Sequence, residues 1–265
     1  MQTGIHPTAI VDPGAVIGDG VVVGPYTIID EDVEIGESTV IGPHVHVASG
    51  ARLGRSCRVH AGAVLAGIPQ DLKFVGEKTY LYVGDRTVIR ECVTLNRGTN
   101  ASGKTVIGSD CLIMAYVHAG HDCMIGNHVI IANSVQMGGH CEIGDYAFIG
   151  GLSGVHQFVR IGRYSMVGGI SRASLDVPPY VMAGGHDAFR YEGLNIVGLK
   201  RKGFSSEKIT LLKNTYRLIF QSGLLLSNAL EKVRSEMPLE PEIAEILEFF
   251  SAGSNGRKFL KPFNN

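Results

Sequence analysis

Aliphatic residues recur at every sixth position through most of residues 5–167. The first run has eleven consecutive steps: Ile5, Val11, Ile17, Val23, Ile29, Ile35, Ile41, Val47, Leu53, Val59 and Leu65. The phase then resumes: Val83, Ile89, Leu95, Ile107, Ile113, Ala119, Ile125, Ile131, Met137, Ile143, Ile149, Val155, Ile161 and Val167. A step of six matches neither the 3.6-residue period of a helix nor the two-residue period of a strand. It is typical of hexapeptide repeats, so we predict an all-β solenoid, a parallel β-helix.

A small or β-branched residue stands four positions after each aliphatic residue, and glycine often follows the aliphatic residue directly. Both suit a narrow coil, because small side chains fit a tight core and glycine adopts turn dihedrals without a Cβ clash. Four of the five cysteines fall on the small inward position: Cys57, Cys111, Cys123 and Cys141. We expect these cysteines to fill the core. The odd number of cysteines argues against a disulfide framework and indicates a reducing compartment.

The repeat is interrupted twice. Between Leu65 and Val83 the in-phase positions are Asp71 and Glu77, which cannot face an apolar core, so the chain near 66–80 should leave the coil as a loop. A second excursion near 96–105, "NRGTNASGKT", is rich in Gly, Asn, Ser and Thr. Loops that project from a rigid scaffold often carry binding residues, so both excursions are candidates for the site.

The six-residue period ends near residue 185. We therefore predict two domains, a β-helix over 1–185 and a small α-helical C-terminal domain over 186–265. Three segments of the second have helical patterns: "SSEKITLLKNTYRLIFQSG", "LLLSNALEKVRSEM" and "PEIAEILEFFSAG".

The charge of the chain excludes several classes of partner. Charged residues make up 18% and the formal net charge is −1, so no global field attracts nucleic acid or an anionic membrane. No stretch approaches the roughly 18 apolar residues of a membrane-spanning helix. The start, "MQTGIHPTAI", has no basic segment followed by a long apolar run. We expect a cytoplasmic protein without stable membrane insertion.

The segment "HAGHDC" at 118–123 is the main candidate for chemistry. His121 suits a general base oriented by Asp122, a zinc ligand, or an ordinary surface histidine, and spacing alone leaves all three open. If three hexads form one coil of 18 residues, His121 lies under Gly139 with His140 beside it, and His156 stacks on Gly138. The N–H of Gly139 would then be available to an oxyanion. Because short strands offer little surface, we expect a second subunit to complete the site.

Several strings together resemble the UDP-N-acetylglucosamine acyltransferase family, in order and spacing. They are "HPTAIV", "PQDLKF", "RGT", "HAGHDC", "GGLSGVHQF", "DVPPYV" and "GLNIVGLKRKGFS", and they span essentially the whole chain. The resemblance implies a left-handed β-helix, an exception to the usual crossover rule, assembled as a homotrimer. It also implies the first step of lipid A biosynthesis. A 3-hydroxyacyl group would pass from acyl carrier protein to the 3-hydroxyl of UDP-N-acetylglucosamine, with neither metal nor acyl-enzyme. No cofactor is implied beyond the phosphopantetheine of the carrier.

The resemblance also implies roles for particular residues. His121 corresponds to the general base and Gly139 to the backbone donor for the oxyanion. Sugar-nucleotide contacts correspond to Asp71, Lys73, His118, His140, His156 and Gln157. Contacts with the pantetheine arm and the acidic carrier correspond to Asn195, Arg201 and Lys202. Gly169 corresponds to the position that sets acyl length, where a bare glycine should admit a long chain.

Two departures from the family pattern leave the acceptor atom open. Val197 stands where enterobacterial members carry Glu, and Asn96 stands where they carry His. Some relatives acylate a 3-amino analogue of the sugar instead. Three further alternatives are a zinc hydro-lyase of the carbonic anhydrase type, a non-catalytic solenoid, and the later N-acyltransferase of the pathway. That last enzyme usually has an extra domain before the coils, whereas here the hexads begin at Ile5.

Overall fold

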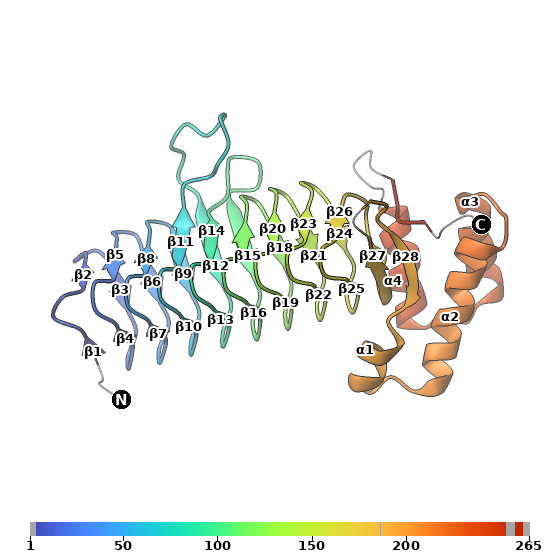
Figure 1. Cartoon of the computed structure of the whole chain (residues 1–265), viewed down its shortest axis with the longest axis horizontal. Helices are drawn as coiled ribbons and strands as arrows, with labels where there is room; N and C mark the ends of the chain where they lie inside the picture. Colours follow the sequence, from blue (N-terminus) through green and yellow to red (C-terminus); the bar gives the residue numbers. More distant parts are fainter. Residues whose placement is uncertain (1–3, 186, 253–257, 262–265) are drawn as a thin grey trace.

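The computed structural model describes residues 4–185, 187–252 and 258–261, and shows a stack of triangular coils followed by helices (Figure 1). Three parallel sheets run along the stack, and each coil contributes one short strand to each sheet. The β-helix predicted from the six-residue period is therefore confirmed.

We name the three sheets A, B and C. Sheet A contains β1 (Gly4–Ile5), β4 (Val22–Val23), β7 (Val40–Ile41), β10 (Arg58–Val59), β13 (Val88–Ile89), β16 (Leu112–Ile113), β19 (Ile130–Ile131), β22 (Phe148–Ile149), β25 (Met166–Val167), β27 (Val181–Gly184) and β28 (Arg190–Leu194). Sheet B contains β2 (Ile10–Val11), β5 (Ile28–Ile29), β8 (His46–Val47), β11 (Val64–Gly67), β14 (Thr94–Asn96), β17 (His118–Ala119), β20 (Gln136–Met137), β23 (Gly154–Val155) and β26 (Arg172–Ala173). Sheet C contains β3 (Val16–Ile17), β6 (Glu34–Ile35), β9 (Ala51–Leu53), β12 (Tyr80–Val83), β15 (Lys104–Ile107), β18 (Met124–Ile125), β21 (Glu142–Ile143) and β24 (Arg160–Ile161).

The turns between the sheets form three edges of the prism, called AB, BC and CA after the sheets that they join. In the regular part of the stack, residues 18 apart pair, as Ile107 does with Ile125 and Ile125 with Ile143. From Val23 onward the inward aliphatic residues are almost fully buried, and so are the four cysteines of the small position, whereas Ile5, Val11 and Ile17 of the first coil are exposed or only partly buried. Each coil thus satisfies the backbone groups of the next while burying its apolar residues.

Each regular corner places one residue in the left-handed backbone region. The non-glycine residues there have φ between 53° and 67°, a conformation that costs an L-residue about 1–2 kcal/mol. Stacked rings offset part of this cost. Tyr146, for example, lies 4.5 Å from His128 on one side and 4.7 Å from Tyr164 on the other, measured between ring centroids. The corner residues therefore form columns along the edges.

Two excursions leave the stack, both at the BC edge and on the same side of the molecule (Figure 1). Residues 68–79 lie between β11 and β12, and residues 97–103 lie between β14 and β15. Leu65 pairs with Leu95, 30 positions on, and Leu95 pairs with Ala119, 24 positions on. These spacings exceed the regular 18 by 12 and by 6, both multiples of six, so the inward phase survives each insertion.

The segment that follows residue 185 begins with a strand, not with the predicted helices. The sequence predicts only helices over 186–265, but β28 is a strand that pairs antiparallel with β27. The hexad period could not reveal it, because an antiparallel partner has no six-residue spacing. Residues 186, 253–257 and 262–265 of this predicted domain lie outside the described residues.

Four helices follow: α1 (Ile196–Arg201), α2 (Ser206–Gln221), α3 (Leu226–Glu236) and α4 (Pro241–Ser251). The last three coincide with the predicted helical segments. Arg160 joins α4 to the coils, because its guanidinium binds the buried Asp176 at 2.9 Å and the carbonyl of Phe249 at 3.1 Å. Within the described ranges, none of these helices combines the length and apolar character needed to cross a bilayer.

The CA edge has a close backbone approach that a substitution can test. A Cβ at Gly108 would overlap the backbone of Gly126 on the next coil, whereas a Cβ at Gly154 would meet nothing within 4 Å. Gly108→Ala should lower the free energy of unfolding by about 1–3 kcal/mol, because the coils must separate to accommodate it. Gly154→Ala should be neutral or slightly stabilising. Thermal midpoints at equal protein concentration measure both, and equal midpoints would contradict the close-packing argument.

Candidate active site

The predicted catalytic residues lie in one column on the BC edge. His121 belongs to the turn between β17 and β18, and Gly139 and His140 belong to the turn between β20 and β21, one coil further along. The backbone N–H of His140 donates to the carbonyl of His121 at 2.9 Å. His156 lies in the following turn, after β23. The stacking expected from a coil of 18 residues is therefore what brings these residues together.

His121 and Asp122 form a hydrogen-bonded pair. Nδ1 of His121 lies 2.7 Å from Oδ2 of Asp122, whose side chain is completely buried. In the part of the chain that the structure describes, the other ring nitrogen, Nε2, has no hydrogen-bond partner. An ionised carboxylate can only accept hydrogen bonds, so this contact favours the tautomer with the proton on Nδ1 and leaves Nε2 free to accept a proton.

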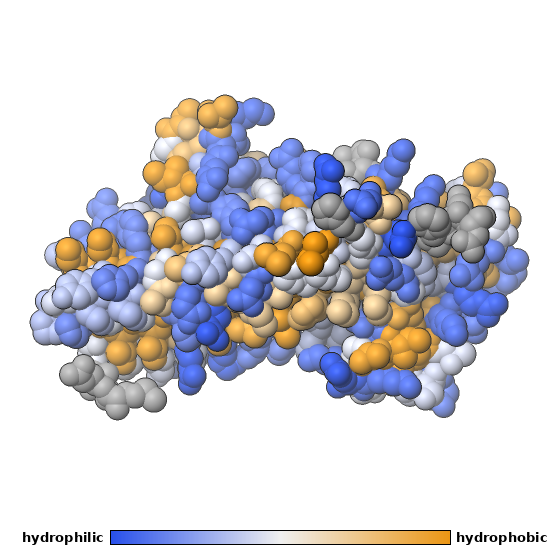
Figure 2. Space-filling model, viewed as in Figure 1, coloured by the Kyte–Doolittle hydropathy of each residue, from blue (hydrophilic) through white to orange (hydrophobic). Residues whose placement is uncertain are grey.

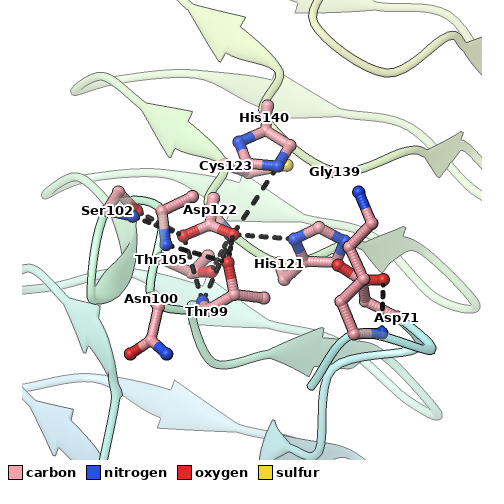
Figure 3. Close-up of polar contacts among 12 residues, drawn as sticks. Asp71, Thr99, Asn100, Ser102, Thr105, His121, Asp122, Cys123, Gly139 and His140 are labelled. Carbon is pink, nitrogen blue, oxygen red and sulfur yellow. Dashed lines mark hydrogen bonds and ion pairs between the residues drawn. The ribbon is translucent and has the colours of Figure 1, made fainter. Parts of the chain in front are cut away.

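Asp122 receives further hydrogen bonds from the second excursion (Figure 3). Thr99 donates its N–H and its hydroxyl, and Ser102 does the same. Burial by itself raises the pKa of Asp122, but the hydrogen bonds from Ser102, Thr99 and His121 outweigh burial and bring this pKa below its ordinary value. Asp122 is therefore a stable carboxylate at neutral pH.

Gly139 lies directly against the ring of His121. A Cβ at Gly139 would come within 2.6 Å of Cε1 and 2.8 Å of Nε2 of that ring, so a side chain there would displace the histidine. Among the described residues, the N–H of Gly139 has no acceptor. An unpaired backbone donor next to a free imidazole nitrogen is the arrangement that an oxyanion site requires.

Two more histidines surround His121. The ring of His140 meets it edge to face at 5.0 Å, and burial lowers the pKa of His140 despite the opposing charge of Asp122. His118 lies on β17 with Nδ1 2.8 Å from the hydroxyl of Thr94. Burial also lowers the pKa of His118, and the neighbouring His121 adds to the effect. Both histidines are therefore neutral at pH 7 and able to donate or accept hydrogen bonds.

The remaining residues predicted for this side are more exposed. His156 and Gln157 lie at the surface of the BC edge. Asp71 lies in the first excursion, where Oδ1 accepts the N–H of Lys73 at 3.0 Å. The negative charge of Asp71 opposes the lowering of the His140 pKa, so the first excursion lies near the histidines of the BC edge.

Other predicted residues lie on different edges. Lys202 sits on the CA edge with Nζ 4.8 Å from the ring centre of Tyr146, and the neighbouring Arg201 is exposed. Asn195 has a structural role on the same edge. It caps α1 by accepting from Gly198 N–H at 3.1 Å and donates to the carbonyl of Tyr164 at 2.8 Å.

Gly169 lies in a turn of the AB edge and is exposed. A single chain thus distributes the predicted site residues over all three edges.

A metal ion fits the cluster poorly. His121, Asp122 and His140 can each offer one ligand atom, and these atoms lie within 4.8 Å of one another. However, both oxygens of Asp122 already accept hydrogen bonds from Thr99 and Ser102. A metal would have to break this arrangement, so the geometry favours a proton-transfer pair over a zinc site.

The sequence analysis did not identify Thr99, Ser102 and Thr105 as site residues. Thr105 supports this corner through the backbone of Asp122, because its hydroxyl oxygen Oγ1 accepts the N–H of Asp122 at 2.8 Å. The only available signal was the Ser/Thr-rich composition of "NRGTNASGKT". Composition did not indicate which atom these side chains would bind.

Two family models match the chain. One, described as Udp N-acetylglucosamine O-acyltransferase, Domain 2, covers residues 176–258. The other, described as Bacterial transferase hexapeptide (six repeats), covers residues 32–67 and 104–139. They correspond to the helical part and to the coils.

Similar curated proteins and solved structures cover nearly the whole chain. An acyl-[acyl-carrier-protein]–UDP-N-acetylglucosamine O-acyltransferase of Chlorobaculum parvum is 75% identical over 100% of both chains. One of Chlorobium phaeobacteroides is 79% identical, covering 98% of this chain and 99% of that protein. The crystal structure of a UDP-N-acetylglucosamine acyltransferase from Bacteroides fragilis is 44% identical with a TM-score of 0.93, covering 97% of this chain and 99% of that one. The chain therefore belongs to the acyl-[acyl-carrier-protein]–UDP-N-acetylglucosamine O-acyltransferase family.

Proposed function

We propose that this protein transfers a 3-hydroxyacyl group from acyl carrier protein to the 3-position of UDP-N-acetylglucosamine, the first step of lipid A biosynthesis, in the cytoplasm. The names of its relatives support the substrates. The observation that carries the mechanism is the free Nε2 of His121 beside the unpaired N–H of Gly139, with Asp122 held against Nδ1.

In this mechanism Nε2 of His121 accepts the proton of the sugar hydroxyl as the hydroxyl oxygen attacks the thioester carbonyl. The Gly139 N–H stabilises the negative charge that develops on the carbonyl oxygen. Asp122 stabilises the imidazolium that forms. When the tetrahedral intermediate collapses, the C–S bond breaks and the departing thiolate of phosphopantetheine takes the proton back from His121. The ester and the free thiol are the products, and the base is regenerated.

The neutral histidines and the first excursion suit the acceptor. We assign sugar-nucleotide contacts to His118, His140, His156 and Gln157 on the coils and to Asp71 and Lys73 on the excursion. A neutral imidazole can both donate a hydrogen bond to a sugar hydroxyl and accept one from it. Lys73 supplies a positive charge for a diphosphate. Asn96 is almost fully buried and donates to the carbonyls of Gly67 and Ile68, a structural role.

The distribution of residues over three edges supports a homotrimer. His121 on the BC edge and Lys202 on the CA edge can belong to one site only if the CA edge comes from a second copy. The first excursion has three exposed apolar residues, Ile68, Leu72 and Val75, and Figure 2 shows apolar surface on it, which supports its burial against that copy. The trimer thus completes the cleft by joining two edges of different subunits.

His121→Ala should reduce kcat/KM by roughly 10²–10⁴-fold, the usual contribution of a general base. The thermal midpoint should change little, because His121 is not part of the apolar core. His44→Ala is the matched control, since His44 stacks on Tyr26 at the AB edge and should leave turnover intact. Retained activity in His121→Ala, measured by transfer to UDP-N-acetylglucosamine, would remove the general-base assignment.

Gly169→Met should shift the preference toward shorter 3-hydroxyacyl chains, with Gly169→Ala showing a smaller shift. The position accepts side chains, because its φ is not positive and a Cβ would contact only backbone atoms of Gly151, at 3.3 Å or more. Assays against carriers loaded with acyl chains of increasing length measure the effect. An unchanged length profile in both variants would show that Gly169 does not limit the acyl groove.

Replacing Arg201 and Lys202 together by Ala should raise KM for acyl carrier protein, because an acidic carrier loses two positive charges at its docking surface. The increase should shrink at high salt, where exposed charges are screened. Lys232→Ala with Arg234→Ala makes the same charge change on α3 and is the control. If both double variants raise this KM equally, the effect comes from net charge alone.

A further inference from the structure

The carboxylate of Asp122 has an unusually complete set of hydrogen bonds for a residue whose side chain is fully buried. Oδ1 accepts from Thr99 N–H at 3.1 Å, from Ser102 N–H at 3.2 Å and from the Ser102 hydroxyl. Oδ2 accepts from Thr99 N–H at 3.2 Å, from the Thr99 hydroxyl at 2.7 Å and from His121. Apart from the bond to His121, all of these come from the second excursion (Figure 3).

These bonds determine where the carboxylate can point. Nε2 of His140 lies 3.8 Å from Oδ2 of Asp122, so two histidines are within reach of one oxygen. A buried carboxylate with fewer donors would turn toward whichever histidine offered an N–H, because an unpaired buried charge is costly. The two hydroxyls and two N–H groups of the excursion hold Oδ2 at 2.7 Å from His121 instead.

The excursion is itself closed and braced. Gly103 N–H donates to the carbonyl of Thr99 at 2.7 Å, which closes the loop. Asn100 N–H donates to Oε1 of Glu77 on the first excursion at 3.2 Å. Thr99 is buried and therefore lies behind Asp122, away from solvent. It acts on the reaction only through the carboxylate.

We propose that Thr99 and Ser102 are positioning residues, whose hydroxyls hold Asp122 on His121 rather than His140 and so keep the base in its Nδ1–H tautomer. This inference rests on the proposed role of His121 as general base. It assigns the second excursion a catalytic purpose that is separate from substrate binding.

The test compares Thr99→Val, Ser102→Ala and the double variant with Thr99→Ser, which keeps the hydroxyl. We expect each of the first two to lower kcat roughly 10-fold and the double variant about 100-fold, part of the contribution of an oriented base. KM for UDP-N-acetylglucosamine should change little, because the proposed sugar-nucleotide contacts belong to other residues. Thr99→Ser should recover most of the kcat lost in Thr99→Val. Asn100→Ala is the matched control on the same loop, with kcat unchanged.

A second measurement separates positioning from general support of the fold. The ¹⁵N signals of the His121 ring, assigned by their loss in His121→Ala, should report the Nδ1–H tautomer in the wild type and a mixture with Nε2–H in the double variant. An unchanged tautomer together with an unchanged kcat would overturn the proposal. So would a fall in kcat that follows only the thermal midpoint while the tautomer stays fixed.

Different results would contradict the general-base role of His121 and the positioning role of Thr99 and Ser102. If His121→Ala retains activity, the general-base mechanism fails and the inference falls with it. If His121→Ala is inactive while the Thr99 and Ser102 variants keep the wild-type kcat and tautomer, only the positioning role is wrong.

Discussion

The structure depends on one constraint, that each coil must satisfy its backbone hydrogen bonds on the next coil. Most strands are only two residues long and cannot be stable alone. Stacking them forces residues 18 apart to superpose, so any polar residue placed at an edge gains a neighbour directly above it. The pair of His121 and Gly139 is a direct product of this superposition. The stacking of the coils therefore fixes the relative positions of these two residues.

The CA and BC edges share one backbone pattern, and both excursions leave the stack at the BC edge. At Gly108 the CA edge brings the backbones of neighbouring coils too close for any side chain, while aromatic rings such as Tyr146 and Tyr164 stack at its corners. The BC edge instead accepts inserted segments, because insertions of 12 and 6 residues leave the inward phase intact. Both excursions leave the stack at the edge that carries His121 and His140.

Much of this architecture follows from the sequence, because the hexad period identifies inward residues such as Ile125 and Cys123 one by one. The proximity of His121, Gly139 and His140 follows from the same arithmetic. The strand β28 and helix α1 do not, since neither has the period. The contacts of Thr99 with Asp122 depend on the path of an irregular loop. No repeat in the sequence encodes that path.

Asp122 combines a strained backbone conformation with a buried charge. It is a corner residue with φ of 60°, a conformation that glycine or asparagine would adopt at lower cost, and it is also the buried carboxylate that orients His121. The hydrogen bonds from Thr99, Ser102 and His121 keep the pKa of this carboxyl below its ordinary value, so the donors around it stabilise the charged form. The strained corner and the buried carboxylate thus depend on one loop, and shortening the second excursion would leave the charge of Asp122 without most of its donors.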